Sequence, residues 1–219
     1  MFPAGYAHEN PIIHQSRVYL AHEQALCSGK FESATEASYD LLQGIIDEHG
    51  PDVHLGDRDV SESLLSYTIN TCALSTRLAR GMSDKVLPLI RYIISQNASV
   101  SPGPLTRAAY CGIPEILSEI LRHCDDANDH FPEEKMGYTA LCCLVTTGGV
   151  VLSRIPRANN DLYQARFSEI AACINILVDH GADSRCMGSS KRSAWLECLD
   201  SEHPLRHLII TRAKSAAVQ

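Results

Sequence analysis

The 219-residue sequence contains no apolar run of about 18 residues, the length that crosses a bilayer, so no membrane span is expected. Its first ten residues lack the basic start and apolar core of a secretory signal. Positive charge is scarce: 19 Lys and Arg stand against 26 Asp and Glu, a net charge of −7. Broad binding to nucleic acids or anionic membranes needs a positive field, and this balance argues against it.

Signatures of cofactor and hydrolase sites are also missing. The sequence has no Gly-x-Gly-x-x-Gly, no Walker sequence and no Gly-x-Ser-x-Gly, and aromatic residues make up only 6% of it. Nine cysteines, an odd number, without a secretory signal are typical of reduced thiols. These features predict an intracellular protein without a cofactor.

The most informative stretch runs from residue 104 to residue 128. Ala108 and Ala109 are small, so a short helix that carries them can lie close to a neighbouring helix. Gly112 fits the left-handed position that ends this helix, and Pro114 fits the first turn of a second helix. The second helix has an apolar stripe formed by Ile116, Leu117, Ile120 and Leu121. Helices this short cannot bury such a stripe alone, so similar pairs are expected on either side.

This stretch resembles the ankyrin repeat, whose pattern is Gly-x-Thr-Pro-Leu-His-x-Ala-Ala-x-x-Gly-x-x-Glu-Ile followed by an apolar helix that ends near Gly-Ala-Asp. Thr106 occupies the histidine position, which is a departure. Residues 137–141 match the opening of the pattern with one change, and residues 181–183 match its ending. The matching residues of the first stretch are Pro104, Leu105, Ala108, Ala109, Gly112, Glu115 and Ile116.

The resemblance implies an all-α solenoid of about five stacked helix pairs, two of them degenerate. We expect an N-terminal arm over residues 1–15, one repeat domain over residues 16–212 and a C-terminal tail over residues 213–219. The expected units are residues 16–52, 53–99, 100–128, 129–183 and 184–212.

Two insertions depart from the family pattern. One is Ala73–Ser83, before a helix expected to start at Asp84. For the other, Gly148 and Gly149 are expected to end a first helix, and Val150–Arg166 then precedes a second helix over residues 167–180. Long loops on repeat scaffolds often carry specificity.

The sequence contains one candidate metal site and one candidate catalytic pair. Cys186, Cys198, His203 and His207 supply two thiols and a His-x-x-x-His pair, residue types that bind zinc. The repeat register places the two thiols apart, so we expect no metal there. Cys124 beside His123 is a weak catalytic pair, because sequence neighbours do not face each other on a helix.

The resemblance implies that another protein is bound on the concave face, at the variable residues after the paired alanines and at the loops before the first helices. Tyr110, Met136 and Tyr138 are the expected anchors, since tyrosine and methionine are enriched in interface cores. The expected contact residues are Tyr110, Cys111, Lys135, Met136, Tyr138, Thr146, Thr147, Asp200 and Ser201.

The sequence therefore favours a protein–protein interaction module. The alternative is a small enzyme on the same scaffold, with a pocket between the concave face and the insertion at residues 150–166. Self-association through the end units is a third possibility. Exposed tyrosines on an open face would favour the binding module, and clustered His, Cys and acidic side chains in a cavity would favour the enzyme.

Overall fold

The computed structural model describes residues 40, 42–55, 62–70, 83–130, 137–156, 158–188, 191–199 and 202–216. These residues are mainly helical, as predicted, and their only strands are two residues long. The chain divides into two compact units, Met1–Ser99 and Val100–Gln219. The expected arm over residues 1–15, the first part of the expected unit over residues 16–52 and most of the 73–83 insertion lie outside the described residues.

The first unit contains three described helical segments. Residues 42–49 are helical and end at Gly50, which has a φ of 83°. Strand β1 (His54–Leu55) then pairs antiparallel with β2 (Glu62–Ser63), directly before a helical segment over residues 64–70. Helix α4 (Ser83–Ser95) contains Pro88 in its interior, and Asn97 follows it in a left-handed conformation with a φ of 66°. The core of this unit contains Leu42, Ile45, Leu64, Leu65, Ile69, Leu89, Ile90 and Ile93.

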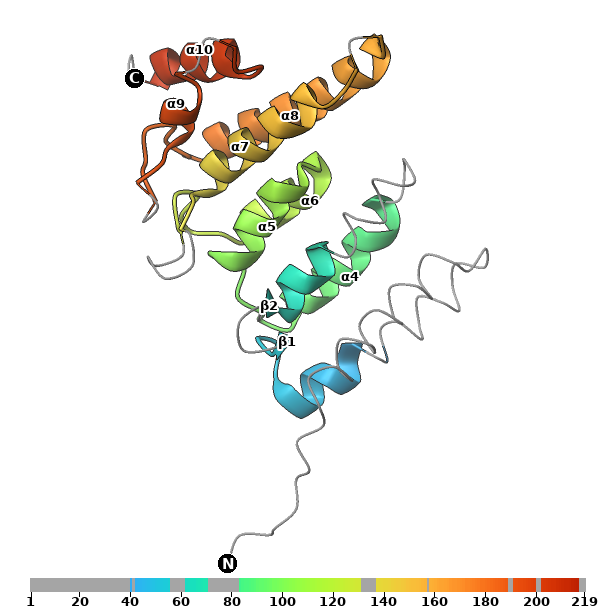
Figure 1. Ribbon diagram of the computed structural model, residues 1–219. Coiled ribbons are helices and arrows are strands. Elements are labelled where there is room, and N and C mark those ends of the chain that lie inside the picture. Colours follow the sequence, from blue (N-terminus) through green and yellow to red (C-terminus); the bar gives the residue numbers. More distant parts are fainter. Residues whose placement is uncertain are drawn as a thin grey trace, which may run out of the picture. The chain divides into compact units, whose positions relative to one another are not determined.

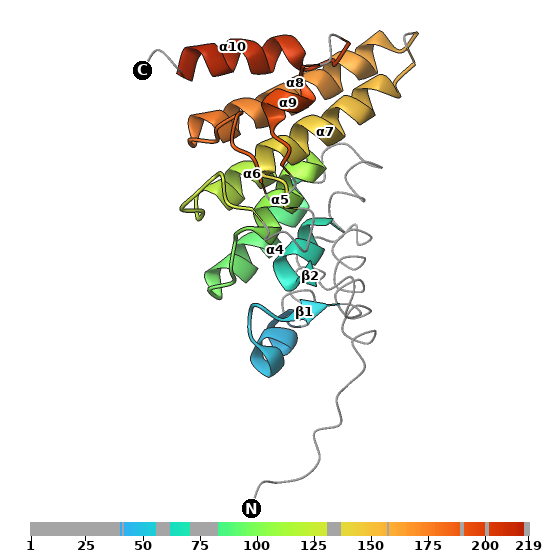
Figure 2. The ribbon, with the colours of Figure 1, turned by 60° about the vertical axis from the view of Figure 1, so that its left-hand side comes forward.

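The second unit is built from three successive helix pairs (Figure 1). They are α5 (Gly103–Cys111) with α6 (Pro114–Leu121), α7 (Ala140–Ser153) with α8 (Asn160–Asp179), and α9 (Ala194–Glu197) with α10 (Arg206–Ala216). The first helices pack on one another, α5 on α7 and α7 on α9, while α6 packs on α8. Figure 2 shows α5, α7 and α9 following one another in this order.

Local sequence explains the helix ends of this unit. Gly112 has a φ of 62° and ends α5, and Pro114 opens α6, both as predicted. Thr139 caps α7, because its hydroxyl oxygen accepts the Cys142 N–H at 3.3 Å. Ser193 caps α9 in the same way. The small or apolar residues predicted to face neighbouring helices, Leu105, Ala108, Ala109, Ile116, Leu117 and Ile120, are all fully buried.

The prediction for the second insertion was wrong. Helix α7 does not end at Gly148 and Gly149 but continues to Ser153, and α8 begins at Asn160. The insertion therefore lengthens both helices instead of forming a loop. Asn159 caps α8 by accepting the Leu162 N–H at 3.3 Å. The C-terminal tail expected from residue 213 also differs, because α10 (Arg206–Ala216) continues into it.

Equivalent ends of successive helix pairs are linked by side chains. The Asn128 side chain accepts the Asp183 N–H at 2.7 Å and donates to the Gly181 carbonyl oxygen at 3.1 Å. Asn128 and Asp183 occupy the same position after their respective helices. In the first unit, a carboxylate oxygen of Asp52 accepts the Ser99 N–H at 2.6 Å, again between two equivalent positions. This repeated bond fixes the register between neighbouring pairs within each unit.

Candidate partner-binding face

The predicted anchor Tyr110 lies in α5 and is 40% exposed, a high value for a tyrosine. The guanidinium carbon of Arg107, one turn earlier, lies 5.6 Å from the centre of its ring. A cation at this distance from an aromatic face is attracted by the ring quadrupole, so Arg107 favours this orientation of the ring. Tyr110 therefore offers an exposed aromatic surface beside a cation.

The second described anchor, Tyr138, is half-buried before α7 and is held by the loop before α9. Its hydroxyl oxygen accepts a hydrogen bond from Nη1 of Arg192 at 3.3 Å. Nε of the same arginine lies 2.9 Å from a carboxylate oxygen of Glu197, and the Arg192 side chain remains 52% exposed. This chain of contacts connects two successive loops with α9.

The two tyrosine–arginine pairs flank the start of α7. Burial raises the pKa of the Cys143 thiol to about 12, and the positive charge of Arg107 opposes this rise. Burial and Glu197 raise the pKa of the adjacent Cys142 thiol to about 12, while Arg192 opposes the rise. Arg107 and Arg192 therefore act on neighbouring residues of one helix. We call the surface of Arg107, Tyr110, Tyr138, Cys143, Lys191 and Arg192 the first-helix face.

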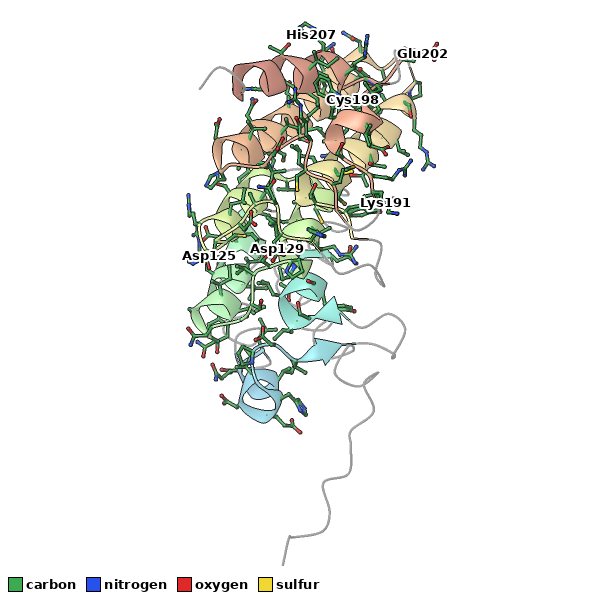
Figure 3. The ribbon with its side chains drawn as sticks, turned by 90° about the vertical axis from the view of Figure 1, so that its left-hand side faces the viewer. Asp125, Asp129, Lys191, Cys198, Glu202 and His207 are labelled. Atoms are coloured by element: carbon green, nitrogen blue, oxygen red, sulfur yellow. The ribbon has the colours of Figure 1, made fainter. Side chains whose placement is uncertain are left out.

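Charge is separated around the loops of the second unit (Figure 3). Lys191 is exposed, with a φ of 56°, and precedes Arg192 in the loop before α9. Figure 3 shows Asp125 at the left of the view, Lys191 toward the right and Asp129 between them. Asp129 accepts the hydroxyl hydrogen of Ser101 at 2.7 Å. Among the residues that the structure describes, the first-helix face thus carries three cations, in a chain of net charge −7.

The other predicted contact residues have different outcomes. Cys111 is only 1% exposed, and its assignment to the binding surface is corrected: as the last residue of α5 it packs inward beside Gly112. Thr146 and Thr147 are half-buried, and their hydroxyls donate to carbonyl oxygens one turn earlier, at 2.9 and 2.7 Å. Lys135, Met136, Asp200 and Ser201 lie outside the described residues.

Four residues of this face, Arg107, Cys143, Lys191 and Arg192, were not among the predicted contact residues. Arg107 was within reach, since residues three apart on a helix are neighbours and its position relative to Tyr110 is visible. Arg192 was not, because its contact with Tyr138 joins residues 54 positions apart through the packing of two loops.

Of the cysteine and histidine residues considered as a zinc site, Cys198 and His203 lie in contact. Sγ of Cys198 lies 3.6 Å from Nδ1 of His203, and this nitrogen also accepts the Leu205 N–H at 3.2 Å. Burial, with Glu197 next in size, raises the pKa of the Cys198 thiol to about 12, so the thiol stays protonated at neutral pH and is a poor nucleophile. Among the described residues, no group of three or more His, Cys, Asp or Glu side chains is arranged to hold a metal ion.

The alternative hypothesis of an enzyme places a pocket between the concave face and residues 150–166, which lie in the lengthened α7–α8 hairpin. Its described side chains include a stacked pair, Tyr163 and Phe167, with ring centres 6.3 Å apart, and an ion pair between Arg166 and Glu169. Val150 and Leu162 are exposed apolar residues, 45% and 38% respectively. These contacts stabilise the helical hairpin.

Comparison with known proteins adds no relative to this picture. No protein-family model matches the chain, and no curated protein matches it. No helix in the described part of the chain is long and apolar enough to cross a membrane.

Proposed function

We propose that this chain is an ankyrin-like repeat protein and that its second unit binds a partner protein through the first-helix face. The stacking of first helix on first helix and second on second supports the repeat assignment, as do the side-chain bonds between equivalent positions. Stacked helical repeats present their first helices and loops as a continuous binding surface.

The observation that carries the binding function is the exposed ring of Tyr110 beside Arg107. An aromatic side chain that is 40% exposed and oriented by a neighbouring arginine loses less conformational freedom on binding than an isolated one. Tyr138 adds a second ring, held by Arg192. Rigid aromatic anchors of this kind dominate the energetics of many interfaces.

The test is affinity capture from a native lysate, comparing the wild type with a Tyr110→Ala/Tyr138→Ala variant. Each truncated anchor is expected to weaken binding by about tenfold, so the double variant should lose the partner. Tyr163→Ala is the matched control, because it removes an equal ring from α8, outside the face. A partner that the double variant retains as well as the wild type does would contradict the proposal.

A further inference from the structure

The charges on the first-helix face define the partner further, and this step rests on the proposed function. The face carries three cations, Arg107, Lys191 and Arg192, and the Arg192 side chain pairs with Glu197. The whole chain has a net charge of −7, so this concentration of positive charge is local.

Arg192 is already oriented to hold a carboxylate. Its Nε–H is directed to a Glu197 oxygen at 2.9 Å, and one Nη1–H is directed to Tyr138 at 3.3 Å. A guanidinium carries five N–H donors, so the described contacts use two of them. The side chain is 52% exposed, which lets a carboxylate from outside reach the remaining donors. Bidentate binding of a carboxylate is the geometry that arginine favours.

Lys191 extends this cationic site along the loop. It is exposed, and it makes no ion pair with any other described side chain. Its backbone N–H donates to the Gly188 carbonyl oxygen at 2.9 Å, which holds the residue in its left-handed conformation. The ammonium group can therefore meet a second carboxylate beside the one on Arg192.

The rings set the spacing of the bound segment. Packed helices lie about 8–10 Å apart, so Tyr110 on α5 and the loop before α9 are separated by roughly 20 Å. An extended chain rises about 3.3 Å per residue and covers this distance with about six residues. A segment of this length can place apolar side chains against Tyr110 and Tyr138 and acidic ones against Arg192 and Lys191.

We propose that the first-helix face binds an extended acidic segment of a partner protein, in which carboxylates meet Arg192 and Lys191 and apolar side chains pack on Tyr110 and Tyr138. Nucleic acid fits less well. A polyanion needs several phosphate contacts, whereas this face has three described cations and Asp125 and Asp129 lie in a loop of the same unit.

The experiment selects ligands without assuming their sequence. A random 12-residue peptide library displayed on phage is selected on the full-length chain, and the selected peptides are synthesised with a fluorescent label. They should be enriched in Asp, Glu and apolar residues. Affinity should fall as NaCl is raised from about 50 to 500 mM, because exposed charge pairs are screened.

Three variants locate the site. Arg192→Gln should weaken binding of the selected peptides by about tenfold, and Lys191→Gln by about threefold. Glu197→Gln should strengthen binding, since it removes the internal carboxylate that competes for Arg192. The matched control is Arg122→Gln on α6, an arginine with a 59% exposed side chain that also pairs with a glutamate, Glu119. It should leave the affinity unchanged.

The outcomes separate this inference from the proposed function. If the selected peptides are neutral or basic and the Tyr110→Ala/Tyr138→Ala variant does not bind them, the acidic partner is ruled out and the binding face remains supported. Peptides whose affinity is the same in the double tyrosine variant would overturn both. Binding of a labelled 12-nucleotide oligo(U) through Arg192, with no enrichment of acidic peptides, would assign the face to nucleic acid instead.

Discussion

Gly188 lies where the backbones of two loops of the second unit touch. A Cβ atom added there would overlap the carbonyl oxygen of Gly137 and lie 2.8 Å from its carbonyl carbon. Both of these atoms belong to the backbone, so neither loop relieves the overlap by a rotamer change. Glycine is needed at this position because of the close approach, and not because of its φ.

Gly188→Ala should therefore lower the free energy of unfolding of the second unit by about 2–4 kcal/mol. The chain has one tryptophan, Trp195, in this unit, so urea unfolding followed by its fluorescence measures the change. Gly44→Ala is the control, because a Cβ there meets no atom within 4 Å in a helical segment of the first unit. An unchanged midpoint for Gly188→Ala would mean that the two loops do not touch in solution.

Because several cysteine thiols are buried, we expect the free energy of unfolding to fall at alkaline pH. Burial, with Glu115 next in size, raises the pKa of Cys173 to about 12, against about 8.5 for an unperturbed thiol. Between these pH values the unfolded chain releases a proton that the native state keeps. The free energy of unfolding therefore falls as pH rises from about 8.5, by up to about 1.4 kcal/mol per pH unit for each such thiol, and is unaffected below that pH.

Urea unfolding under reducing conditions at pH 8 and pH 10 checks this sign. Lysine and tyrosine also titrate in this range, so the informative quantity is the difference between variants. Cys173→Ala should lose less stability between the two pH values than the wild type does. Ile174→Val, which removes a buried methylene from the same helix, should lower stability at both pH values and keep the wild-type difference. Equal differences in all three proteins would disprove the role of the buried thiol.

At the scale of elements, α7 explains which part of the fold the sequence could not predict. Gly148 and Gly149 looked like a helix end because glycine favours the left-handed cap. Instead, because these glycines have no side chain, residues from later in the chain pack closely against α7. A Cβ on Gly148 would lie 3.0 Å from Ile170, and one on Gly149 would lie 2.5 Å from Nε2 of His203. The local sequence around Gly149 does not indicate that His203, 54 residues later, packs against this helix.

The elements that were predicted well depend on local chemistry. Gly112, Asn97 and Gly181 have positive φ at the expected helix ends, and the apolar stripes of α5 and α6 are buried. For the candidate site, the exposure of Tyr110 followed from its repeat position, but the burial of Cys111 next to it did not, since adjacent residues at the end of a helix face different directions. Contacts between loops, such as Tyr138 with Arg192, depend on how successive pairs stack.

A double-mutant cycle tests the interpretation of α7. Alanine is about 1 kcal/mol better than glycine in a helix interior, so Gly149→Ala would stabilise the protein if nothing opposed it. With His203 present, the added methyl displaces the ring that accepts the Leu205 N–H, and we expect a net loss of about 1–3 kcal/mol. In a His203→Ala background the same substitution should be neutral or stabilising. Additive effects in the Trp195 unfolding curves would show that the ring does not pack on Gly149.

At the scale of the whole molecule, the stacking of helix pairs predicts that a destabilising substitution opens the helices near it and leaves distant helices folded. In a repeat array each pair contacts only its neighbours, so stability is approximately a sum over pairs and their interfaces. In the second unit, α9 packs on α7 and on α10, whereas α5 packs on α6 and α7. Destabilising the last pair should therefore open α9 and α10 and leave α5 and α6 protected.

Leu205→Ala is the substitution for this test, because Leu205 is fully buried beside Gly148 and α10 follows it directly. Truncating a buried leucine costs about 2–5 kcal/mol, enough to populate an opened last pair. Hydrogen exchange followed by mass spectrometry should show faster exchange over residues 194–216 and wild-type exchange over residues 103–121. The mirror variant, Leu117→Ala in α6, should raise exchange in α5 and α6 first. If either variant accelerates exchange equally in every helix of the second unit, that unit folds as one globular body, and the repeat assignment on which the binding proposal stands is wrong.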